Sequence, residues 1–292
     1  MKHPEHRESI FHEEAEILAH EIHPAGQYVL RLRAPYCAAR AEPGQFAHLR
    51  CDPLLPMRRP ISIQRAEEDR IELLYKVVGE GTRLLSRRRV GETLDLLGPI
   101  GQPFRPDPVR TRRLLIGGGV GMPPMIFLAE KLRGNAGETF VILGSEIPFP
   151  FTPKPSALLV PGLPDSVLGA MPLLEDWGIP SRLASQQGFA GCHQGYVTDL
   201  ARAWLSHQGE EQLAETELFA CGPRAMLEAT ARLAHEFGLP AQLSLEEYMA
   251  CGVGGCAGCA VQIQTPDGPA MKRVCVDGPV FPAEAVFPEI VG

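Results

Sequence analysis

Apolar and polar residues alternate in short segments over the first third of the chain, between residue 14 and about residue 105. Turn residues separate these segments at fairly even intervals, a pattern that is typical of an antiparallel barrel. We therefore predict strands at residues 27–33, 45–50, 60–64, 70–78 and 91–97, with a short helix at 82–89.

The pattern changes near residue 106, where Pro106 and Pro108 precede a basic stretch. Strand and helix patterns then alternate to about residue 243, which predicts a parallel sheet with helices on its faces. The predicted strands are 113–116, 139–143 and 217–220, and the predicted helices are 123–133, 197–207 and 224–237. The last helix ends before Gly238, and its expected buried face consists of Met226, Thr230, Leu233 and Phe237.

Residues 148–164 interrupt this alternation with six prolines and little periodicity. We interpret them as a surface excursion inside the α/β region rather than a domain boundary. A loop that faces a partner and an inert insertion both fit this pattern.

Composition limits the class of protein. The 292 residues are enough for two or more domains with a short third piece, and a hydrophobic content of 45% indicates a globular protein. The net charge of −7 weighs against a nucleic-acid partner, and we interpret Arg87–Arg89 as a solvated face. The first 14 residues lack the apolar core of a signal peptide, and no run is long enough to span a membrane, so we expect the cytoplasm.

Four of the eight cysteines are gathered near the C-terminus with C-x4-C-x2-C spacing and a distant fourth member; they are Cys251, Cys256, Cys259 and Cys275. This spacing is that of plant-type [2Fe-2S] ligation. Four glycines let the loop adopt positive φ and turn backbone N–H groups toward sulfur, namely Gly252, Gly254, Gly255 and Gly258. A four-cysteine zinc site and a pair of disulfides are the alternatives, although zinc sites usually have two C-x2-C pairs.

A glycine-rich loop at residues 116–124 follows the first predicted strand of the α/β region and opens a predicted helix. Gly119 and Gly121 can there present backbone N–H groups to a pyrophosphate, although glycines also permit tight strand–helix packing. Cys221 follows another predicted strand and would lie at the carboxyl edge of the sheet, where such folds bind ligands. Taken alone, Cys221 is better explained as a small buried residue before a helix.

Two segments of the barrel have the chemistry of phosphate binding. Arg59 and Ser62 flank the rigid Pro60, and the loop Gly79–Thr82 enters a helix. A guanidinium binds phosphate through two parallel donors, and such a loop binds it through backbone N–H groups. Taken separately, each segment is more often a turn and a surface ion pair.

Together and in this order, the motifs resemble the ferredoxin-NADP reductase superfamily along nearly the whole chain. Residues 246–259 and 275–281 resemble, more narrowly, the electron-transfer subunits of dihydroorotate dehydrogenase B complexes. This resemblance implies three parts: an antiparallel FAD-binding β-barrel at residues 10–107, a parallel-sheet NAD-binding α/β domain at 108–243, and a small [2Fe-2S] domain at 244–292.

The resemblance also implies roles for single residues. The expected FAD contacts are Arg59, Pro60, Ile61, Ser62, Leu74, Tyr75, Lys76, Gly81 and Thr82. Gly119 and Gly121 would face the dinucleotide, and Cys221 would lie near the nicotinamide. The four gathered cysteines would bind iron, and no acid–base catalyst is implied.

Such a chain would pass electrons between NAD(H) and a separate FMN-containing dihydroorotate dehydrogenase catalytic subunit, in pyrimidine biosynthesis. A flavin suits this task because it exchanges both hydride and single electrons. The corresponding reductase subunit of an NAD(P)H:ferredoxin oxidoreductase, a hydrogenase or a sulfite reductase complex is the alternative, and a zinc-bearing binding module without flavin is the alternative of another class. Gln186 lacks the fixed positive charge that pairs with a 2′-phosphate, so we expect NADH to be preferred over NADPH.

Overall fold

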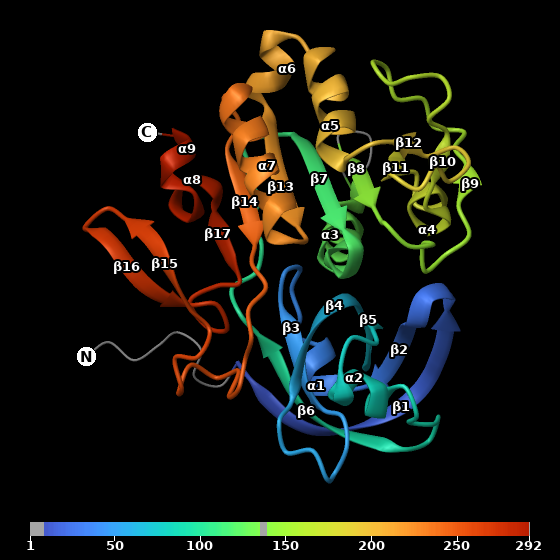
Figure 1. Ribbon diagram of the computed structural model, residues 1–292, viewed down its shortest axis with the longest axis vertical. Coiled ribbons are helices and arrows are strands. Elements are labelled where there is room, and N and C mark those ends of the chain that lie inside the picture. The colour runs from blue at the N-terminus through green and yellow to red at the C-terminus, as the bar shows by residue number, and fades with distance from the viewer. Residues whose placement is uncertain (1–8, 135–138, 292) are drawn as a thin grey trace.

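The computed structural model describes residues 9–134 and 139–291, so most of the charged N-terminal stretch, residues 1–8, lies outside the described part. A closed barrel lies below a seven-stranded sheet, and a hairpin near the C-terminus lies beside the junction of the two (Figure 1). No helix within the described ranges is both long and apolar enough to cross a membrane.

Six antiparallel strands close the barrel in the order β1-β2-β5-β4-β3-β6, which confirms the predicted barrel. Their bounds are β1 Phe11–His23, β2 Gln27–Arg33, β3 Phe46–Arg50, β4 Arg59–Glu67, β5 Arg70–Lys76 and β6 Thr93–Ile100, and the connections contain η1 Pro24–Gly26, α1 Pro35–Ala38 and α2 Glu80–Leu85. On β3, Ala47 and Leu49 pack inside the barrel, whereas Phe46 and His48 point outward. This alternation gives β3 one face toward the barrel core and one toward the rest of the molecule.

Seven strands form the second sheet in the order β12-β11-β8-β7-β13-β14-β17. Their bounds are β7 Arg112–Gly118, β8 Thr139–Gly144, β11 Ser181–Ser185, β12 His193–Gln194, β13 Thr216–Cys221, β14 Ala241–Ser244 and β17 Val280–Pro282. Every neighbouring pair is parallel except β14 with β17. The predicted parallel sheet is therefore confirmed, with one antiparallel strand added at its edge.

Helices cover both faces of this sheet, which is why its central strands are continuous apolar runs. The helix bounds are η2 Gly119–Gly121, α3 Met122–Lys131, α4 Pro172–Asp176, α5 Val197–Ser206, α6 Glu210–Ala214 and α7 Arg224–Glu236. Leu115 on β7 packs on the side of α3 and α4, while its neighbours Leu114 and Ile116 pack on the side of α5 and α7.

The buried face of α7 differs in part from the prediction. Its buried residues are Leu227, Thr230, Ala231, Leu233 and Ala234. Thr230 and Leu233 were predicted, but Met226 and Phe237 are only half-buried. Met226 instead lies against Gly118 and Gly222 at the end of the sheet.

The C-terminal part shares its apolar core with the α/β sheet. It contains the hairpin β15 Ala260–Thr265 and β16 Gly268–Arg273, followed by α8 Ala283–Val286 and α9 Pro288–Val291. β17 is hydrogen-bonded to β14, and Phe281 and Phe287 are buried in the same cluster as Leu218 of β13. The thiol-bearing segment is therefore held against the sheet and is not a separate globule.

The proline-rich excursion forms a small two-stranded sheet, β9 Lys154–Pro155 with β10 Gly169–Ala170, beside α4 at the outer edge (Figure 1). The Glu175 carboxylate accepts hydrogen bonds from Ser156 Oγ at 2.8 Å and from the Ala157 N–H at 2.6 Å. The buried Arg182 guanidinium donates to the Leu158 carbonyl at 2.7 Å. Side chains of the α/β domain therefore fix the course of this loop.

Candidate functional site

A cleft of about 1110 Å³ separates the barrel from the α/β sheet. Its barrel wall comes from β3, β4 and β5, and its other wall comes from the carboxyl ends of β7, β8, β13 and β14. Most of the cofactor-binding residues expected from the sequence line it: Arg59, Pro60, Ile61, Ser62, Leu74, Tyr75, Lys76, Thr82, Gly119 and Cys221. Gly81 and Gly121 do not line the cleft. At each of them, other protein atoms occupy the space that a side chain would take.

The outward faces of β3 and β4 form one continuous surface at the cleft. Phe46 lies opposite Ser62, and His48 lies opposite Pro60. Ile61, between Pro60 and Ser62, packs inside the barrel. Phe46, Pro60 and Ser62 therefore turn their side chains toward the cleft, whereas Ile61 offers its backbone.

Gly81 lies in the first turn of α2, where the Arg59 side chain crosses the helix. A Cβ at Gly81 would lie 2.5 Å from Arg59 Nε, so glycine makes room for the guanidinium. Thr82 Oγ accepts the N–H groups of Val78 at 3.0 Å and Gly79 at 3.3 Å, which fixes the loop that enters the helix. A guanidinium held in this way at the cleft is suited to bind phosphate.

The glycine-rich loop connects β7 to α3 at the opposite wall of the cleft. Gly119 has φ 57°, and no atom lies within 4 Å of the Cβ position that a larger residue would occupy there. At Gly121 a Cβ would lie 2.3 Å from the Cys221 carbonyl oxygen, so this glycine serves the close approach of the loop to β13. The first turn of α3 has no side-chain cap, but Pro123 and Pro124 carry no N–H and the Met122 N–H donates to the Gly119 carbonyl, so the open backbone on this wall is at Gly119.

Cys221 ends β13 at the floor of the cleft and is 1% exposed. Burial raises the pKa of its thiol, the Glu246 carboxylate raises it further, and a hydrogen bond with Ser244 lowers it. Burial also raises the pKa of the Glu246 carboxyl. The Cys221 thiol is therefore neutral at neutral pH, which fits a positioning group and does not fit a thiolate nucleophile.

Sequence reasoning missed two sets of cleft residues. Glu146 follows β8 by two residues, and its carboxylate accepts the Gln186 N–H and Gln187 Nε2 at 3.4 Å each. Residues 244–249 continue from β14 along the cleft. Both sets follow the carboxyl ends of parallel strands, where ligands of such sheets bind. That rule, applied to the predicted strand 139–143, would have found Glu146, but β14 itself was not predicted.

The four gathered cysteines converge in two pairs. The Cys256 thiol is close enough to Cys251 to influence its pKa, and the Cys259 thiol is close enough to Cys275 to influence its pKa. Cys256 is exposed and Cys251 is half-buried, whereas the other pair is buried in the shared core. The structure thus brings together all four residues that the sequence predicted as iron ligands.

Backbone N–H groups point at the thiol sulfurs, as the glycine content of the loop predicts. The donors and acceptors are Gly255 to Cys251 at 3.3 Å, Gly258 to Cys256 at 3.4 Å, and Cys275 to Cys259 at 3.5 Å. The expectation about φ was right for Gly252 and Gly254, at 68° and 78°. It was wrong for Gly255 and Gly258, because the third left-handed position of the loop is Ala257, at φ 54°.

Cys251 and Cys275, one from each pair, differ in their affinity for protons. Burial alone would raise the pKa of Cys251, but the N–H groups of Val253, Cys256 and Gly255 and the neighbouring thiol lower it to about 7. Burial and the adjacent Cys259 raise the pKa of Cys275 to about 12. The Cys275 thiol is therefore protonated at neutral pH and loses its proton when a cation binds, as is usual for buried thiolate ligands.

Arg273 ties the thiol loop to the turn that follows β16. Its Nη1 donates to the Gly254 carbonyl at 2.9 Å, and its Nε donates to Asp277 at 3.0 Å. The loop therefore keeps its shape through contacts outside the cysteines themselves.

His48 lies beneath the thiol loop on the outward face of β3. Its ring is fully buried, and a Cβ at Gly252 would lie 2.5 Å from its Nδ1. Burial and the Arg58 guanidinium lower its pKa to about 4, against the opposing influence of the Arg58 and Cys251 carbonyls. Neither ring nitrogen has a hydrogen-bond partner within the described part of the chain.

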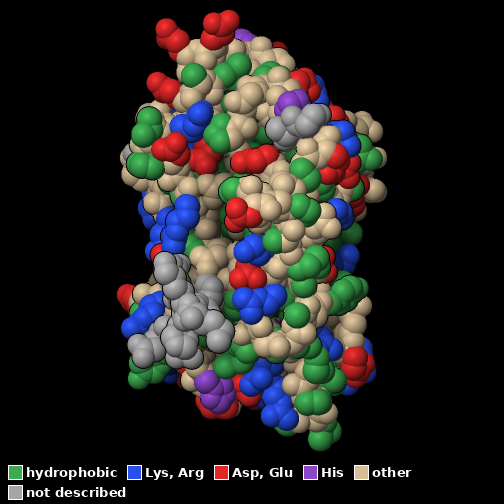
Figure 2. Space-filling model, turned by 90° about the vertical axis from the view of Figure 1, so that its left-hand side faces the viewer, with side chains coloured by type: hydrophobic (Ala, Val, Ile, Leu, Met, Phe, Trp, Pro, Cys, Tyr) green, Lys and Arg blue, Asp and Glu red, His purple; other side chains and the backbone are tan. Residues whose placement is uncertain are grey.

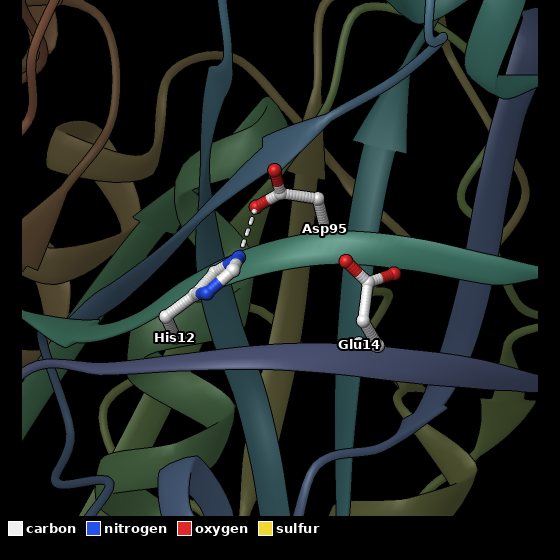
Figure 3. Close-up of side chains that lie close together, drawn as sticks. All are labelled: His12, Glu14 and Asp95. Carbon is white, nitrogen blue, oxygen red and sulfur yellow. Dashed lines mark hydrogen bonds and ion pairs between the residues drawn. The ribbon is translucent and has the colours of Figure 1, made fainter.

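A second group of metal-ligand types lies on the outer surface of the barrel, where ligand atoms of His12, Glu14 and Asp95 lie within 4.8 Å of one another (Figure 3). His12 Nε2 is 3.1 Å from Asp95, and Arg58 Nη2 donates to both Asp95 oxygens at 2.7 and 2.8 Å. Although partial burial opposes it, the contacts with Arg58 and His12 lower the pKa of Asp95. Arg58 already supplies the countercharge, so we explain this group as an ion pair.

Comparison with known proteins identifies the C-terminal part first. The model of a family described as the iron-sulfur cluster binding domain of dihydroorotate dehydrogenase B matches residues 246–287. All four gathered cysteines lie inside this match. The chain therefore carries an iron–sulfur domain.

Whole-length relatives extend this match. The dihydroorotate dehydrogenase B (NAD(+)) electron transfer subunit of Caldanaerobacter subterraneus subspecies tengcongensis is 34% identical over 253 residues, which are 85% of this chain and 88% of that protein. The protein of the same name from Desulforamulus reducens is 32% identical over 276 residues, which are 92% of this chain and 96% of that protein.

Solved structures show the same arrangement. A chain of the NADH-dependent reduced ferredoxin-NADP oxidoreductase, described in connection with flavin-based electron bifurcation, gives a TM-score of 0.74 at 26% identity and covers 96% of this chain and 92% of that one. A ferredoxin NADP+ reductase from Neisseria gonorrhoeae with bound FAD and NADP gives 0.57 at 14% identity, covering 79% and 92%, and so shows the fold alone. The chain belongs to the family of dihydroorotate dehydrogenase B (NAD(+)) electron transfer subunits, and its function is electron transfer within an oxidoreductase.

Proposed function

We propose that the chain passes electrons between NAD and a separate FMN-containing dihydroorotate dehydrogenase catalytic subunit, through FAD in the cleft and a [2Fe-2S] cluster on the four cysteines. The observation that carries this proposal is the common face shared by the two sites. Pro60 and Ser62 on β4 line the cleft, while His48 on the adjacent strand β3 lies under the thiol loop. Neighbouring strands are ~4.8 Å apart, so the two sites border each other.

FAD fits the barrel wall of the cleft. Bound there, it would supply the exchange between hydride and single electrons. The Arg59 guanidinium, held over Gly81, would bind phosphate, and the buried strands β4 and β5 would exclude water from one side of the ring. The cleft exceeds the ~300–1,000 Å³ of pockets for one drug-sized ligand, which leaves room for a nicotinamide beside a flavin.

The spacing of the thiols favours a dinuclear cluster over a single zinc ion. Four sulfurs around one tetrahedral zinc lie ~3.8 Å apart, because each Zn–S bond is ~2.3 Å long. No three of the four thiol sulfurs lie within 4.8 Å of one another, although they pair two by two. Cys251, Cys256, Cys259 and Cys275 therefore fit two irons, one for each pair.

The nucleotide wall fits NAD rather than NADP. Glu146 lies just beyond the carboxyl end of β8, the second strand of the parallel sheet in chain order. In dinucleotide-binding folds an acidic residue at this position binds a ribose 2′-hydroxyl. A carboxylate there repels a 2′-phosphate. The open backbone at Gly119 would face the pyrophosphate, with Cys221 near the nicotinamide.

The partner would dock where the cluster is most accessible. Cys256 is the exposed ligand of the four. The side of the molecule that carries the β15–β16 hairpin is the one shown in Figure 2, where cationic, anionic and apolar side chains are interspersed. A surface of this kind fits a protein partner held by mixed contacts.

Reconstitution tests the proposal. The purified chain should show flavin bands and a broader iron–sulfur absorption, and should reduce dyes with NADH by itself. It should form NADH from dihydroorotate only after addition of an FMN-containing dihydroorotate dehydrogenase subunit from the same organism. A colourless chain that contains zinc would refute the cofactors, and absence of dihydroorotate-dependent NADH would refute the partner.

One observation favours a second candidate function. The structural match to the NADH-dependent reduced ferredoxin-NADP oxidoreductase covers nearly the whole of both chains. The same reconstitution therefore includes a ferredoxin. Turnover with reduced ferredoxin, in the absence of turnover with dihydroorotate, would replace the first proposal with this one.

A further inference from the structure

His48 connects the cleft wall to the thiol loop. It lies opposite Pro60 in the β3–β4 pair, and Pro60 lines the cleft. Its ring touches Gly252 on the other side, next to the ligand Cys251. Side chains directly opposite each other on adjacent strands have Cβ atoms ~4.5–5.5 Å apart. His48 therefore lies between a strand that lines the proposed flavin site and the residue next to Cys251.

The choice of imidazole at this position needs a reason. Its outward-facing neighbour on β3 is Phe46, and an apolar ring would fill the same space at lower cost. A buried imidazole carries at least one N–H, and among the described residues no acceptor meets that donor in hydrogen-bond geometry. The Cys251 carbonyl is one of the two acceptors near the ring.

We propose that His48 is a positioning residue for the cluster: it donates its ring N–H to the Cys251 carbonyl when the cluster is bound, and so fixes this end of the loop against the flavin-binding face of the barrel. This inference rests on the proposed function, because it assumes a cluster on the four cysteines and FAD in the cleft. A hydrogen bond to the backbone of a ligand residue is one of the influences that set the reduction potential of a cluster.

The proposal assigns His48 two measurable effects. Loss of the donor should lower the reduction potential of the cluster, because hydrogen bonds around the ligands help to set that potential. It should also slow the arrival of electrons at the cluster after NADH is mixed with the protein, because the Cys251 end of the loop is no longer fixed against the barrel.

Two replacements of His48 distinguish the effect of its hydrogen-bond donor from the effect of the volume of its ring. His48→Phe keeps a buried ring without a donor, and His48→Asn places an amide near the Nδ1 position. For His48→Phe we expect a roughly tenfold shift of the one-electron equilibrium away from the reduced cluster, about 59 mV. His48→Asn should recover most of it. The readouts are potentiometric titration followed by electron paramagnetic resonance, and rapid mixing with NADH.

The control is His235→Phe, on the exposed side of α7, which should leave the potential at its wild-type value. Flavin content shows whether each variant is folded. Equal potentials and equal rates in wild type and His48→Phe would overturn the inference. Absence of cluster or flavin from the wild-type protein would instead refute the proposed function, so the two failures are distinguishable.

A double-mutant cycle tests the contact itself. Gly252→Ala would put a Cβ 2.5 Å from His48 Nδ1 at a backbone φ of 68°, so bound iron should fall severalfold. Adding His48→Ala makes room for that methyl group and should restore part of the iron. The matched control is Gly238→Ala, with φ 65° and no atom within 4 Å, which has the same backbone strain without the ring contact. Iron losses that simply add in the double variant would contradict the contact.

Discussion

Single residues around the cleft show how far sequence patterns extend. The family resemblance assigned Arg59, Ser62 and Cys221 to one site, and all three line the cleft. It did not show that the space beside Gly121 belongs to the Cys221 carbonyl. That contact joins residues a hundred positions apart, and no local pattern encodes it.

The exposed ligand Cys256 gives the first prediction. Cys256→Ser should abolish or strongly reduce bound iron, because one of the four thiolates is lost. It should leave FAD bound, since the flavin wall of the cleft lies on β4 and β5. Iron, acid-labile sulfide and flavin are measured on the purified protein. Cys192→Ser, at a half-buried thiol outside the cluster, is the control that should keep wild-type iron. Full sulfide in Cys256→Ser would refute the assignment.

Glu146 gives the second prediction at this scale. Glu146→Gln removes the negative charge that faces the nucleotide wall while keeping a similar shape. The KM for NADPH should fall about tenfold, equivalent to ~1.4 kcal/mol, while kcat changes little. Steady-state dye reduction with both nucleotides measures this. Glu236→Gln on the exposed face of α7 should change neither KM. An unchanged KM for NADPH would place the 2′ position elsewhere.

Elements whose own sequence alternates clearly between apolar and polar residues could be predicted. Elements that form only because they pair with another strand could not. The predicted strand 27–33 coincides with β2, since its alternation is clear without context. β1 was missed because glutamates and histidines interrupt the alternation of its sequence, FHEEAEILAHEIH, and only one face is buried. β17 has three residues, too few for any period, and is a strand only because β14 offers an open edge. Long-range pairing is the information that a single sequence lacks.

The anchoring of the proline-rich excursion gives a prediction at the scale of one element. Glu175→Ala removes the charged acceptor of two hydrogen bonds from this loop and should cost ~1–3 kcal/mol, because hydrogen bonds to a charged group contribute more than neutral ones. Asp176→Ala removes only an exposed ion pair with Lys154 and should cost ~0–1 kcal/mol. Urea unfolding measures both, and limited proteolysis within 148–164 should be faster for Glu175→Ala alone. Equal costs would show that the loop is held elsewhere.

Direct contacts join the α/β domain to the barrel on one side and to the thiol-bearing segment on the other. Arg65 of β4 pairs with Glu130 of α3 at 2.8 Å and lies 5.3 Å over the Trp177 ring, which joins the barrel to the α/β domain. β17 and its neighbours join the thiol-bearing segment to the sheet. The domain limits at 107 and 243 remain predictions, and the second of them falls within β14 and separates most of that strand from its neighbour β17.

Truncation after residue 244 tests this joining. The shortened chain loses β17 and the buried Phe281 and Phe287, and exposes the edge of β14 together with part of the shared core. We expect a lower unfolding temperature and self-association, by contrast with Cys256→Ser, which keeps these residues. Thermal unfolding and size-exclusion chromatography compare the two. A truncated monomer as stable as the full chain would show that the sheet does not depend on its last strand.

The unequal exposure of the two thiol pairs should also determine how the protein is oxidised in air. Oxygen would reach a cluster bound on these cysteines most easily from the side of Cys256, because Cys259 and Cys275 are enclosed in the core. We therefore expect oxidation of a ligand thiolate to sulfenic and then sulfinic acid to begin at Cys256. The lifetime of the cluster in aerated buffer consequently reports whether that side is covered, and a subunit that docks there should lengthen it.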